Sequence, residues 1–406
     1  SNSKMEYDIC IVGGAGHVGL PLAIVFANHG RKTLIYDLNT EVMDLVKSGV
    51  VPFTEEGGEA ALKSALASGN LHFSNDASLT GAADTLIITI GTPVDEFLNP
   101  VYKAMSQCMD AFIPFISDEQ LIILRSTVPP GVTNWLHRYL GAKGLSPRLA
   151  FCPERVVQGK AITEIQSLPQ IVSGATEEAA DAAADVFSAL GAEIVRMQPM
   201  EAEFAKLFCN AYRYINFAIT NQFYMMVESA GLDYDRILSG MKQDYDRMAG
   251  LPSAGLAAGP CLFKDTLQLC SFYENQFSLG FDAVMVNEGL PLFMVRNMEK
   301  EHNLLEMTVG LLGMAFKPNS DDTRSSLSYK LKKILHPRAK HVIYTDPHVT
   351  TDDSLLSLED TIAQSDILIL CVPHAAYKGL DLKGKPCVDI WNFLPRESAP
   401  APCPSE

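Results

Sequence analysis

Basic residues are scarce in this chain of 406 residues, which has 32 Lys and Arg against 48 Asp and Glu and a formal net charge of −16. Affinity for a nucleic-acid backbone depends on clustered Lys and Arg that release counterions, so we expect no nucleic acid among its partners. Long apolar runs are missing as well. None approaches the roughly 18 residues that a membrane helix requires, so no membrane partner is expected.

The nine cysteines lack the spacings of a metal or disulfide site. They form no CxxC pair and no even framework, which argues against zinc and against disulfides, so we expect reduced thiols and no metal. The first residues hold no basic stretch followed by an apolar segment. No signal peptide is therefore predicted, and the cytoplasm is the expected location.

The N-terminal stretch YDICIVGGAGHVGLPLAIVFANHGRKTLIYDLN has the pattern of a strand, a glycine turn, a helix and a second strand that ends at Asp37. Gly14, Gly16 and Gly19 form the G-x-G-x-x-G spacing, which permits a tight turn, close approach of the backbone to a pyrophosphate and close helix packing. A carboxylate at the end of the second strand can accept hydrogen bonds from an adenosine ribose. The pattern thus favours NAD as cofactor over a purely structural glycine turn. The predicted NAD-binding residues of this stretch are Gly14, Gly16, His17, Val18, Gly19 and Asp37.

Two further predicted strands are followed by threonines. Thr92 lies in DTLIITIGTPVDE and Thr127 in QLIILRSTVPPGVT. Ligands of an open parallel sheet lie beyond the carboxyl ends of its strands, so both residues are predicted to line the cofactor. The alternative is that they are ordinary turn hydroxyls.

The order of these patterns predicts an α/β protein in which two Rossmann-like, doubly wound parallel-sheet domains are joined by a long central helix and a helical domain. We expect an NAD-binding domain at residues 5–196, a helical dimerisation domain at 197–305, a second α/β domain at 306–394, and a disordered tail, rich in Pro and Ser, at 395–406. The long helix has a mixed aromatic and Met face that suits pairing with another subunit. The alternative is a core helix within one subunit.

Cys261, in AAGPCLFKDTLQL, lies between a Gly-Pro turn and a Lys-Asp pair that introduces an apolar, helix-like run. A cysteine in such a stretch is either a small core residue or a nucleophile. Lys206, Asn210 and Arg213 are spaced i, i+4, i+7 on the long helix, so they share one face. A Lys with an Asn suits stabilisation of an oxyanion, although surface helices also carry such polar stripes.

Eight stretches, taken in order, resemble the UDP-glucose/GDP-mannose dehydrogenase family, the nucleotide-sugar 6-dehydrogenases. They are GGAGHVGLPLA, IGTPVDE, STVPPG, CPERVVQGKA, EFAKLFCNAYR, AAGPCLFKD, GLLGMAFKPNSDDTR and VDIWN. The resemblance covers nearly the whole chain and implies NAD-dependent oxidation of the C6 primary alcohol of a nucleotide sugar to the uronate. It also implies a homodimer or higher homo-oligomer and a C-terminal domain that binds the UDP-sugar.

Carried over residue by residue, the resemblance implies that Cys261 is the nucleophile of a G-x-C-x-x-K-D motif. It implies that Lys206 and Asn210 stabilise oxyanions, and that Asp265 and Glu154 lie near the water of hydrolysis. The pair Gly-Pro precedes the cysteine here, where the family often has Gly-Gly or Gly-His, which puts the shape of this loop in doubt more than the reaction type.

In the C-terminal part, the resemblance implies that Lys317 of AFKP contacts the nucleotide sugar and that Arg324 of DDTR reaches the NAD. The family also has an arginine that crosses the dimer interface to the sugar, for which Arg247 is the nearest candidate. The predicted substrate-binding residues are Glu154, Arg155, Lys206, Asn210, Arg213, Arg247, Gly259, Lys264, Phe316 and Lys317.

Oxidation of a primary alcohol to a carboxylate removes four electrons, so one site must pass two hydrides to two successive NAD molecules and hold the aldehyde between the two steps. A thiolate holds it as a thiohemiacetal, which the second hydride transfer converts to a thioester that water hydrolyses. By analogy with the family, CPER in place of Asn-Pro-Glu favours a UDP-N-acetylhexosamine as substrate, with UDP-glucose and GDP-mannose as alternatives. Two other classes stay open: a two-electron β-hydroxyacid dehydrogenase, which has no use for Cys261, and a non-catalytic NAD or nucleotide-sugar binding module.

Overall fold

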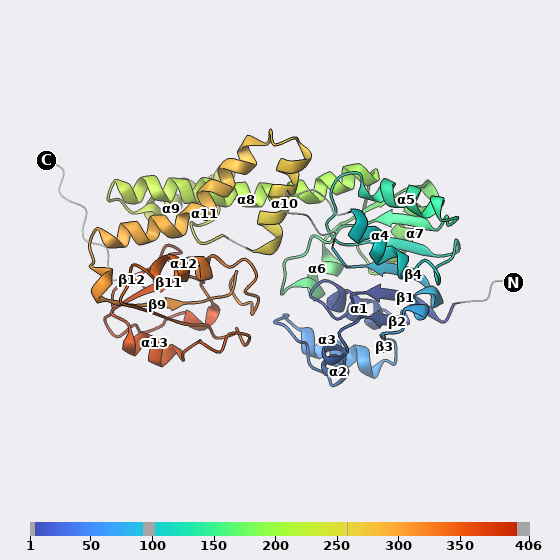
Figure 1. The fold of residues 1–406 in the computed structure, drawn as a ribbon, viewed down its shortest axis with the longest axis horizontal. Helices are drawn as coiled ribbons and strands as arrows, with labels where there is room; N and C mark the ends of the chain where they lie inside the picture. Colours follow the sequence, from blue (N-terminus) through green and yellow to red (C-terminus); the bar gives the residue numbers. More distant parts are fainter. Residues whose placement is uncertain (1–4, 92–101, 258, 396–406) are drawn as a thin grey trace. The chain divides into compact units, whose positions relative to one another are not determined.

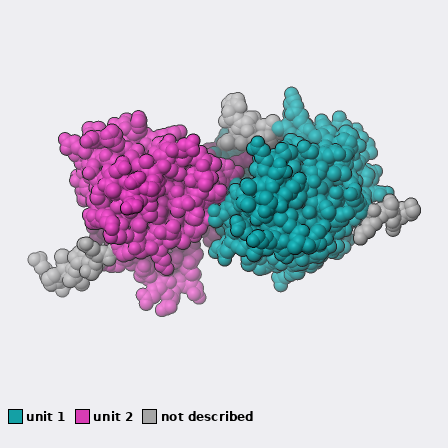
Figure 2. Space-filling view, turned by 90° about the horizontal axis from the view of Figure 1, so that it is seen from below, with its two compact units in different colours: residues 1–210, 265–277 teal, residues 211–264, 278–406 magenta. Residues whose placement is uncertain are grey.

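The computed structural model describes residues 5–91, 102–257 and 259–395. The chain divides into two compact units (Figure 2). Unit 1 comprises residues 1–210 and 265–277, and unit 2 comprises residues 211–264 and 278–406. The expected disordered tail and Thr92 lie outside the described residues.

Unit 1 is built on a sheet with the strand order β3-β2-β1-β4-β5-β6-β7-β8. All neighbouring strands are parallel except β6 and β7, which are antiparallel. The strand order reverses between β1 and β4, which is the point where doubly wound sheets bind ligands. The strands are β1 (Tyr7–Val12), β2 (Thr33–Tyr36), β3 (Leu71–Ser74), β4 (Ala83–Ile88), β5 (Leu121–Leu124), β6 (Arg148–Phe151), β7 (Gln170–Gly174) and β8 (Ile194–Arg196).

Helices cover both faces of this sheet (Figure 1). Its central strands are therefore continuous apolar runs such as LIIL in β5, because a parallel strand is buried on both sides. Short polar caps start several helices: the side chain of Asn39 accepts from the Val42 amide, and that of Thr176 from the Ala179 amide. The helices are α1 (Gly19–Asn28), α2 (Thr40–Lys47), α3 (Gly58–Ala67), α4 (Tyr102–Asp110), α5 (Val132–Ala142), α6 (Ala161–Ser167) and α7 (Glu177–Ser188).

A single helix, α8 (Pro199–Ser229), begins in unit 1 and continues into unit 2, so the predicted long helix is confirmed. Its N-terminal part is tied to the rest of unit 1 by Glu203, which is fully buried. The Glu203 carboxylate accepts hydrogen bonds from the Gly131 amide and from the Thr133 amide and hydroxyl, each at 3.0 Å. Over the residues that the structure describes, α8 and every other helix are too short or too polar to cross a bilayer.

Unit 2 contains a smaller, entirely parallel sheet with the order β10-β9-β11-β12. Its strands are β9 (Thr308–Leu312), β10 (His341–Thr345), β11 (Ile367–Leu370) and β12 (Cys387–Val388). The helices of unit 2 are the second half of α8, α9 (Tyr234–Lys242), the start of α10 (Pro260–Phe272), α11 (Ser278–Glu299), α12 (Leu327–Leu335) and α13 (Leu358–Gln364). The prediction of an α/β protein with two parallel sheets, and with a long helix and further helices between the sheets in chain order, is confirmed.

Candidate active site

The glycine turn between β1 and α1 has the packing that its spacing predicts. A Cβ atom on Gly19 would lie 2.5 Å from the Gly13 carbonyl oxygen, and one on Gly14 would lie 2.8 Å from Ile35 Cγ2. Gly16 is exposed, and a Cβ there would meet nothing closer than 3.4 Å. Gly14 and Gly19 therefore permit close packing of strand, turn and helix, whereas Gly16 leaves the backbone open to a ligand.

Asp37 directly follows β2 and lies beside this turn. Its Oδ2 accepts from the Ala15 amide at 3.1 Å, and its Oδ1 accepts from the Asn39 amide at 2.9 Å. These bonds hold the carboxylate at the carboxyl end of β2, where an adenosine ribose would bind. His17, in the turn, stacks on Phe53 with ring centroids 4.4 Å apart. Val18 directly precedes α1, and Thr127 follows β5 as a half-buried residue.

Glu154 is 8% exposed and has hydrogen-bond donors at both carboxylate oxygens. Its Oε2 accepts from Arg125 Nη2 at 3.0 Å, and its Oε1 accepts from the Val156 amide at 3.0 Å. Arg125 is fully buried and also donates to the Cys152 carbonyl and to Gln170 Oε1. The buried guanidinium balances the charge of Glu154 and fixes its orientation.

Asn210 of α8 and Asp265 of α10 meet within unit 1. Asn210 Nδ2 donates to Asp265 Oδ2 at 2.6 Å, and both residues are buried, with 5% and 2% exposure. Lys206 lies one turn before Asn210 on the same face of α8 and is half-buried. Three of the predicted catalytic residues thus belong to neighbouring parts of one unit.

Cys261 is an exposed residue of unit 2 and lies in the first turn of α10. The helix begins at Pro260, one residue before the cysteine. Lys264 follows one turn later and is half-buried. Asp265 follows Cys261 by four positions along the same helix. Side chains at this spacing lie on one face of a helix.

Arg324 of unit 2 is held by Asp322. Its Nε donates to both Asp322 oxygens at 3.0 Å, and its Nη2 donates to Oδ2 at 2.6 Å. Hydrogen bonding to Asp322 raises the pKa of Arg324 above its usual value, and the negative charge of a Cys261 thiolate acts in the same direction. A cation that is always charged therefore lies in the neighbourhood of the candidate nucleophile.

The loop that carries Phe316 and Lys317 is anchored by a buried dyad that the motifs did not predict. Asp346 Oδ2 accepts from the Met314 amide at 2.7 Å and from His374 Nε2 at 2.8 Å. His374 Nδ1 accepts from the Asn319 amide at 2.9 Å, at the other end of the loop. The side chains of the dyad are both fully buried, so the loop is held at its two ends by one rigid pair.

The three arginines predicted to bind substrate lie in different parts of the chain. Arg155 Nη2 donates to the Pro169 carbonyl at 2.7 Å. Arg213 is exposed on α8, and Arg247 is exposed with its guanidinium over the Tyr245 ring, 4.9 Å from the centroid.

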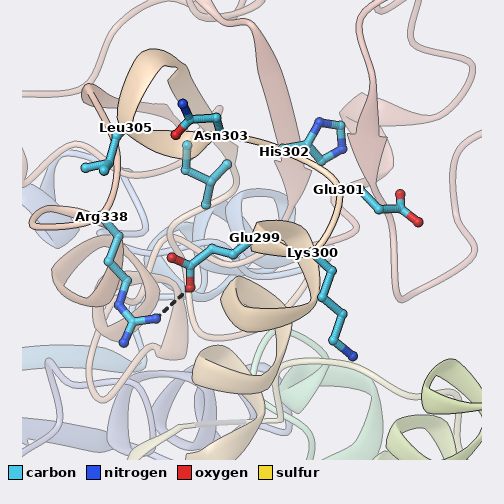
Figure 3. A pocket seen from close by; sticks show the side chains of 8 residues that line it. Glu299, Lys300, Glu301, His302, Asn303, Leu305 and Arg338 are labelled. Atoms are coloured by element: carbon cyan, nitrogen blue, oxygen red, sulfur yellow. Dashed lines mark hydrogen bonds and ion pairs between the residues drawn. The ribbon is translucent and has the colours of Figure 1, made fainter.

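A shallow hollow elsewhere on unit 2 contains none of the predicted residues (Figure 3). It lies around the C-terminal end of α11 and is lined by residues 299–305 and Arg338. Its one ion pair joins Arg338 Nη1 to Glu299 Oε1 at 2.7 Å. We do not regard this hollow as the active site.

Sequence patterns missed Arg125, His374 and Asp346. A weak signal exists for the first: Arg125 directly follows the apolar strand run LIIL, and Glu154 comes three residues after the next strand. The two therefore fall at the same edge of a parallel sheet. No local pattern pairs His374 with Asp346, which are 28 positions apart.

A glycine turn packed for a dinucleotide, a carboxylate at the end of β2 and a second parallel sheet define an NAD-binding α/β protein. Three domains of the UDP-glucose/GDP-mannose dehydrogenase family match this chain, in chain order. The NAD binding domain matches residues 7–190, the central domain 200–288 and the UDP binding domain 310–396. The chain belongs to the UDP-glucose/GDP-mannose dehydrogenase family, whose members are NAD-dependent dehydrogenases.

Individual relatives agree with this assignment. A UDP-N-acetyl-D-mannosamine dehydrogenase of Methanococcus maripaludis (strain C7) is 29% identical over 96% of this chain and 94% of its own. The solved UDP-D-ManNAc dehydrogenase of Pyrococcus horikoshii superimposes with a TM-score of 0.87 at 27% identity, with 97% of each chain covered. A UDP-glucose dehydrogenase from Pyrobaculum islandicum has a TM-score of 0.86, also at 27% identity and 97% coverage of each chain.

Proposed function

We propose that this protein oxidises the C6 primary alcohol of a UDP-N-acetylhexosamine to the uronate, with two NAD as hydride acceptors and Cys261 as the nucleophile. The observation that carries the proposal is the buried hydrogen bond between Asn210 and Asp265, because α10 presents Asp265 one helical turn after Cys261. A two-electron dehydrogenase would need neither the thiol nor this second helix.

The proposed chemistry proceeds in three stages. The first hydride leaves C6 for NAD, the hydroxyl proton leaves, and an aldehyde forms. The Cys261 thiolate then adds to the aldehyde carbon, and a second NAD takes the hydride of the thiohemiacetal to leave a thioester. Water finally breaks the C–S bond, so that one alcohol, two NAD and one water yield the carboxylate, two NADH and three protons.

The other predicted catalytic side chains suit the charges that develop in these three stages. In both the thiohemiacetal stage and the hydrolysis, negative charge develops on the former carbonyl oxygen, and the Lys206 ammonium and Asn210 amide would stabilise it. The hydrogen bond to Asp265 fixes the orientation of the Asn210 amide. We assign Asp265 and Glu154 to the neighbourhood of the hydrolytic water.

NAD would bind at the glycine turn of unit 1, with its ribose at Asp37 and with Thr92 and Thr127 beside it. The open backbone at Gly16 and the hydrogen-bonded Asp37 carboxylate fit this cofactor. Arg324 would reach the cofactor from the C-terminal part. The nucleotide sugar would bind the loop of Phe316 and Lys317, together with Arg155, Arg213, Arg247, Gly259 and Lys264. We assign these roles to an NAD-binding domain at 5–196, a helical dimerisation domain at 197–305 and a UDP-sugar-binding domain at 306–394.

The sugar is inferred from two sources. The stretch CPER replaces the Asn-Pro-Glu that is common in UDP-glucose enzymes. Relatives that match nearly the full chain are named UDP-N-acetyl-D-mannosamine dehydrogenases and NDP-N-acetyl-D-galactosaminuronic acid dehydrogenases. UDP-N-acetylmannosamine is therefore the first substrate to test. Because a catalytic thiolate must stay reduced, we propose the cytoplasm as the site of action.

The test counts NADH released per nucleotide sugar consumed, across UDP-N-acetylmannosamine, UDP-N-acetylglucosamine, UDP-N-acetylgalactosamine, UDP-glucose and GDP-mannose. Two NADH per sugar, lost in Cys261→Ser but kept in Cys209→Ser, supports the thioester route. Cys209 is the matched control because it is also exposed. One NADH per sugar, or an active Cys261→Ser, would assign the protein to the two-electron class. NAD binding without any NADH would indicate a binding module.

We also propose that the protein forms a homodimer through α8. Five apolar side chains are exposed along one stripe of this helix: Phe208 (56%), Tyr212 (67%), Ile219 (39%), Phe223 (40%) and Met226 (61%). Such a stripe suits pairing with a second copy. Met226→Lys should shift the mass measured by light scattering from dimer toward monomer, whereas Leu305→Lys, at an equally exposed residue outside the stripe, should not. A monomeric parent protein would contradict the proposal.

A further inference from the structure

The segment that leads to Cys261 is packed against the C-terminal part of unit 2. Ala254, Leu256 and Ala257 are buried, and Gly255 lies against the face of Trp391. A Cβ atom on Gly255 would lie 2.4 Å from Cη2 of Trp391, well inside van der Waals contact. No residue larger than glycine fits here while the indole keeps its place.

Trp391 is itself held in position. Its Nε1 donates to the Cys371 carbonyl at 3.0 Å, just after β11, and its ring packs into two apolar clusters of unit 2. Trp391 belongs to VDIWN, a stretch for which the chemistry above has no other role. The indole therefore acts as a fixed surface on which the Gly255 backbone rests.

The other side of the segment is held by two buried amides. The Gly255 amide donates to Asn221 Oδ1 at 2.9 Å, and Asn221 Nδ2 donates to Asn287 Oδ1 at 2.9 Å. Asn287 Nδ2 in turn donates to the Tyr214 carbonyl at 3.1 Å. Asn221 of α8 and Asn287 of α11 are both fully buried, in a part of unit 2 where the two helices run side by side (Figure 1).

A series of fully buried, hydrogen-bonded amides destabilises a protein unless every donor and acceptor in it has a partner. When all have partners, the series fixes one geometry. This series connects α11, α8 and the backbone of residue 255 without a gap. Closer to the cysteine, Gly259 has a φ of +131° and lies against Phe316, whose Cδ2 would be 2.8 Å from a Cβ atom there. The backbone at residues 255 and 259 is thus held by two aromatic rings and one chain of buried amides.

We propose that Trp391 and the Asn221–Asn287 pair are positioning residues that set the place of Cys261 through the Gly255 backbone. The proposal rests on Cys261 as the nucleophile only for its effect on turnover. A displacement of about 1 Å in a reacting group can cost up to about a hundredfold in rate. A change at residue 255 or 391 should therefore reduce kcat and leave NAD binding at the glycine turn of unit 1 unchanged.

The first experiment exchanges size between the two contacting residues. Gly255→Ala should lower kcat by about tenfold or more, with the Kd for NADH within about twofold of the parent. Gly255→Ala/Trp391→Leu should recover a large part of that loss, because the smaller side chain makes room for the new methyl group. Gly250→Ala is the matched control in the same segment, since a Cβ there meets nothing within 4 Å, and it should leave kcat unchanged.

Two results would overturn the proposal: a kcat for Gly255→Ala within about twofold of the parent, or a double variant no faster than Gly255→Ala. If Gly255→Ala fails to fold, the kcat values of Trp391→Phe and Trp391→Leu test the proposal instead. The phenylalanine keeps an aromatic face against Gly255 and should retain most of kcat, whereas the leucine should not. Equal kcat values in these two variants would also overturn it.

A readout without catalysis separates this proposal from the proposed function. Iodoacetamide alkylation of Cys261, followed by mass spectrometry of its peptide, should change in rate by about threefold or more in Trp391→Leu and in Asn221→Ala. Alkylation of Cys209, which is also exposed, should keep its rate. An unchanged Cys261 rate refutes the positioning role even if the parent makes two NADH. An inactive parent with a changed rate refutes only the proposed function.

Discussion

Replacement of Arg125 by Met should destabilise unit 1 strongly. The guanidinium is fully buried, donates to Glu154, to Gln170 and to the Cys152 carbonyl, and lies over the Phe187 ring with Cζ 4.8 Å from its centroid. Methionine fills much of the volume but leaves the Glu154 carboxylate buried without its counter-charge. Removal of one partner of a buried ion pair costs about 3–5 kcal/mol.

Because the chain has two units, the measurement should report on unit 1 alone. Hydrogen exchange of the β5 amides gives the free energy of opening of that sheet. We expect Arg125→Met to lower it by about 3–5 kcal/mol and Arg125→Lys, which keeps the charge but not the forked geometry, by less. Glu154→Gln removes the carboxylate charge and provides the second variant of a double-mutant cycle.

The cycle tests the reasoning directly. If the ion pair is the cause, Arg125→Met/Glu154→Gln should cost at least about 1 kcal/mol less than the sum of the two single changes. Strict additivity, or a loss under about 1 kcal/mol in Arg125→Met, would refute the assignment of the pair as the main source of stability at this edge of the sheet.

Two further predictions concern the Asp346–His374 dyad and the glycine turn. Burial raises the pKa of Asp346, but the hydrogen bond from His374 and those from the backbone amides outweigh burial and lower it to about 2. Its folded pKa lies below the unfolded value, so its contribution of about 2 kcal/mol is present above pH 4 and is lost as the pH falls toward 2. The difference in unfolding free energy between the parent and Asp346→Asn should therefore shrink over that interval, and a constant difference would contradict the lowered pKa of Asp346. Gly19→Ala places a methyl group 2.5 Å from the Gly13 carbonyl and should weaken NADH binding about tenfold or more in a fluorescence titration, whereas Gly141→Ala, where a Cβ has open space, should not; equal affinities would refute the packing argument.

The local sequence determined those features whose parts lie close together along the chain. The glycine turn, the β1–α1–β2 unit and Asp37 span about thirty residues, and the spacing alone predicts the succession of strand, turn, helix and strand. The length of α8 and the two parallel sheets were likewise predictable, because apolar periodicity and buried strand runs are local patterns. The structure places Asn210 and Asp265 in contact, and their catalytic roles stay predictions.

Only the tertiary structure decided the contacts between distant segments. Glu154 acquires its Arg125 partner because β5 and β6 are adjacent, and Asn210 meets Asp265 across 55 positions. Gly255 contacts Trp391 although strands β9 to β12 lie between them in the chain. The helix of Cys261 also begins one residue before the thiol, whereas the pattern indicated a start after it. Such partners leave no periodic or motif signal, because a buried polar or aromatic side chain is selected by the surface that folding brings against it and not by its neighbours in the chain.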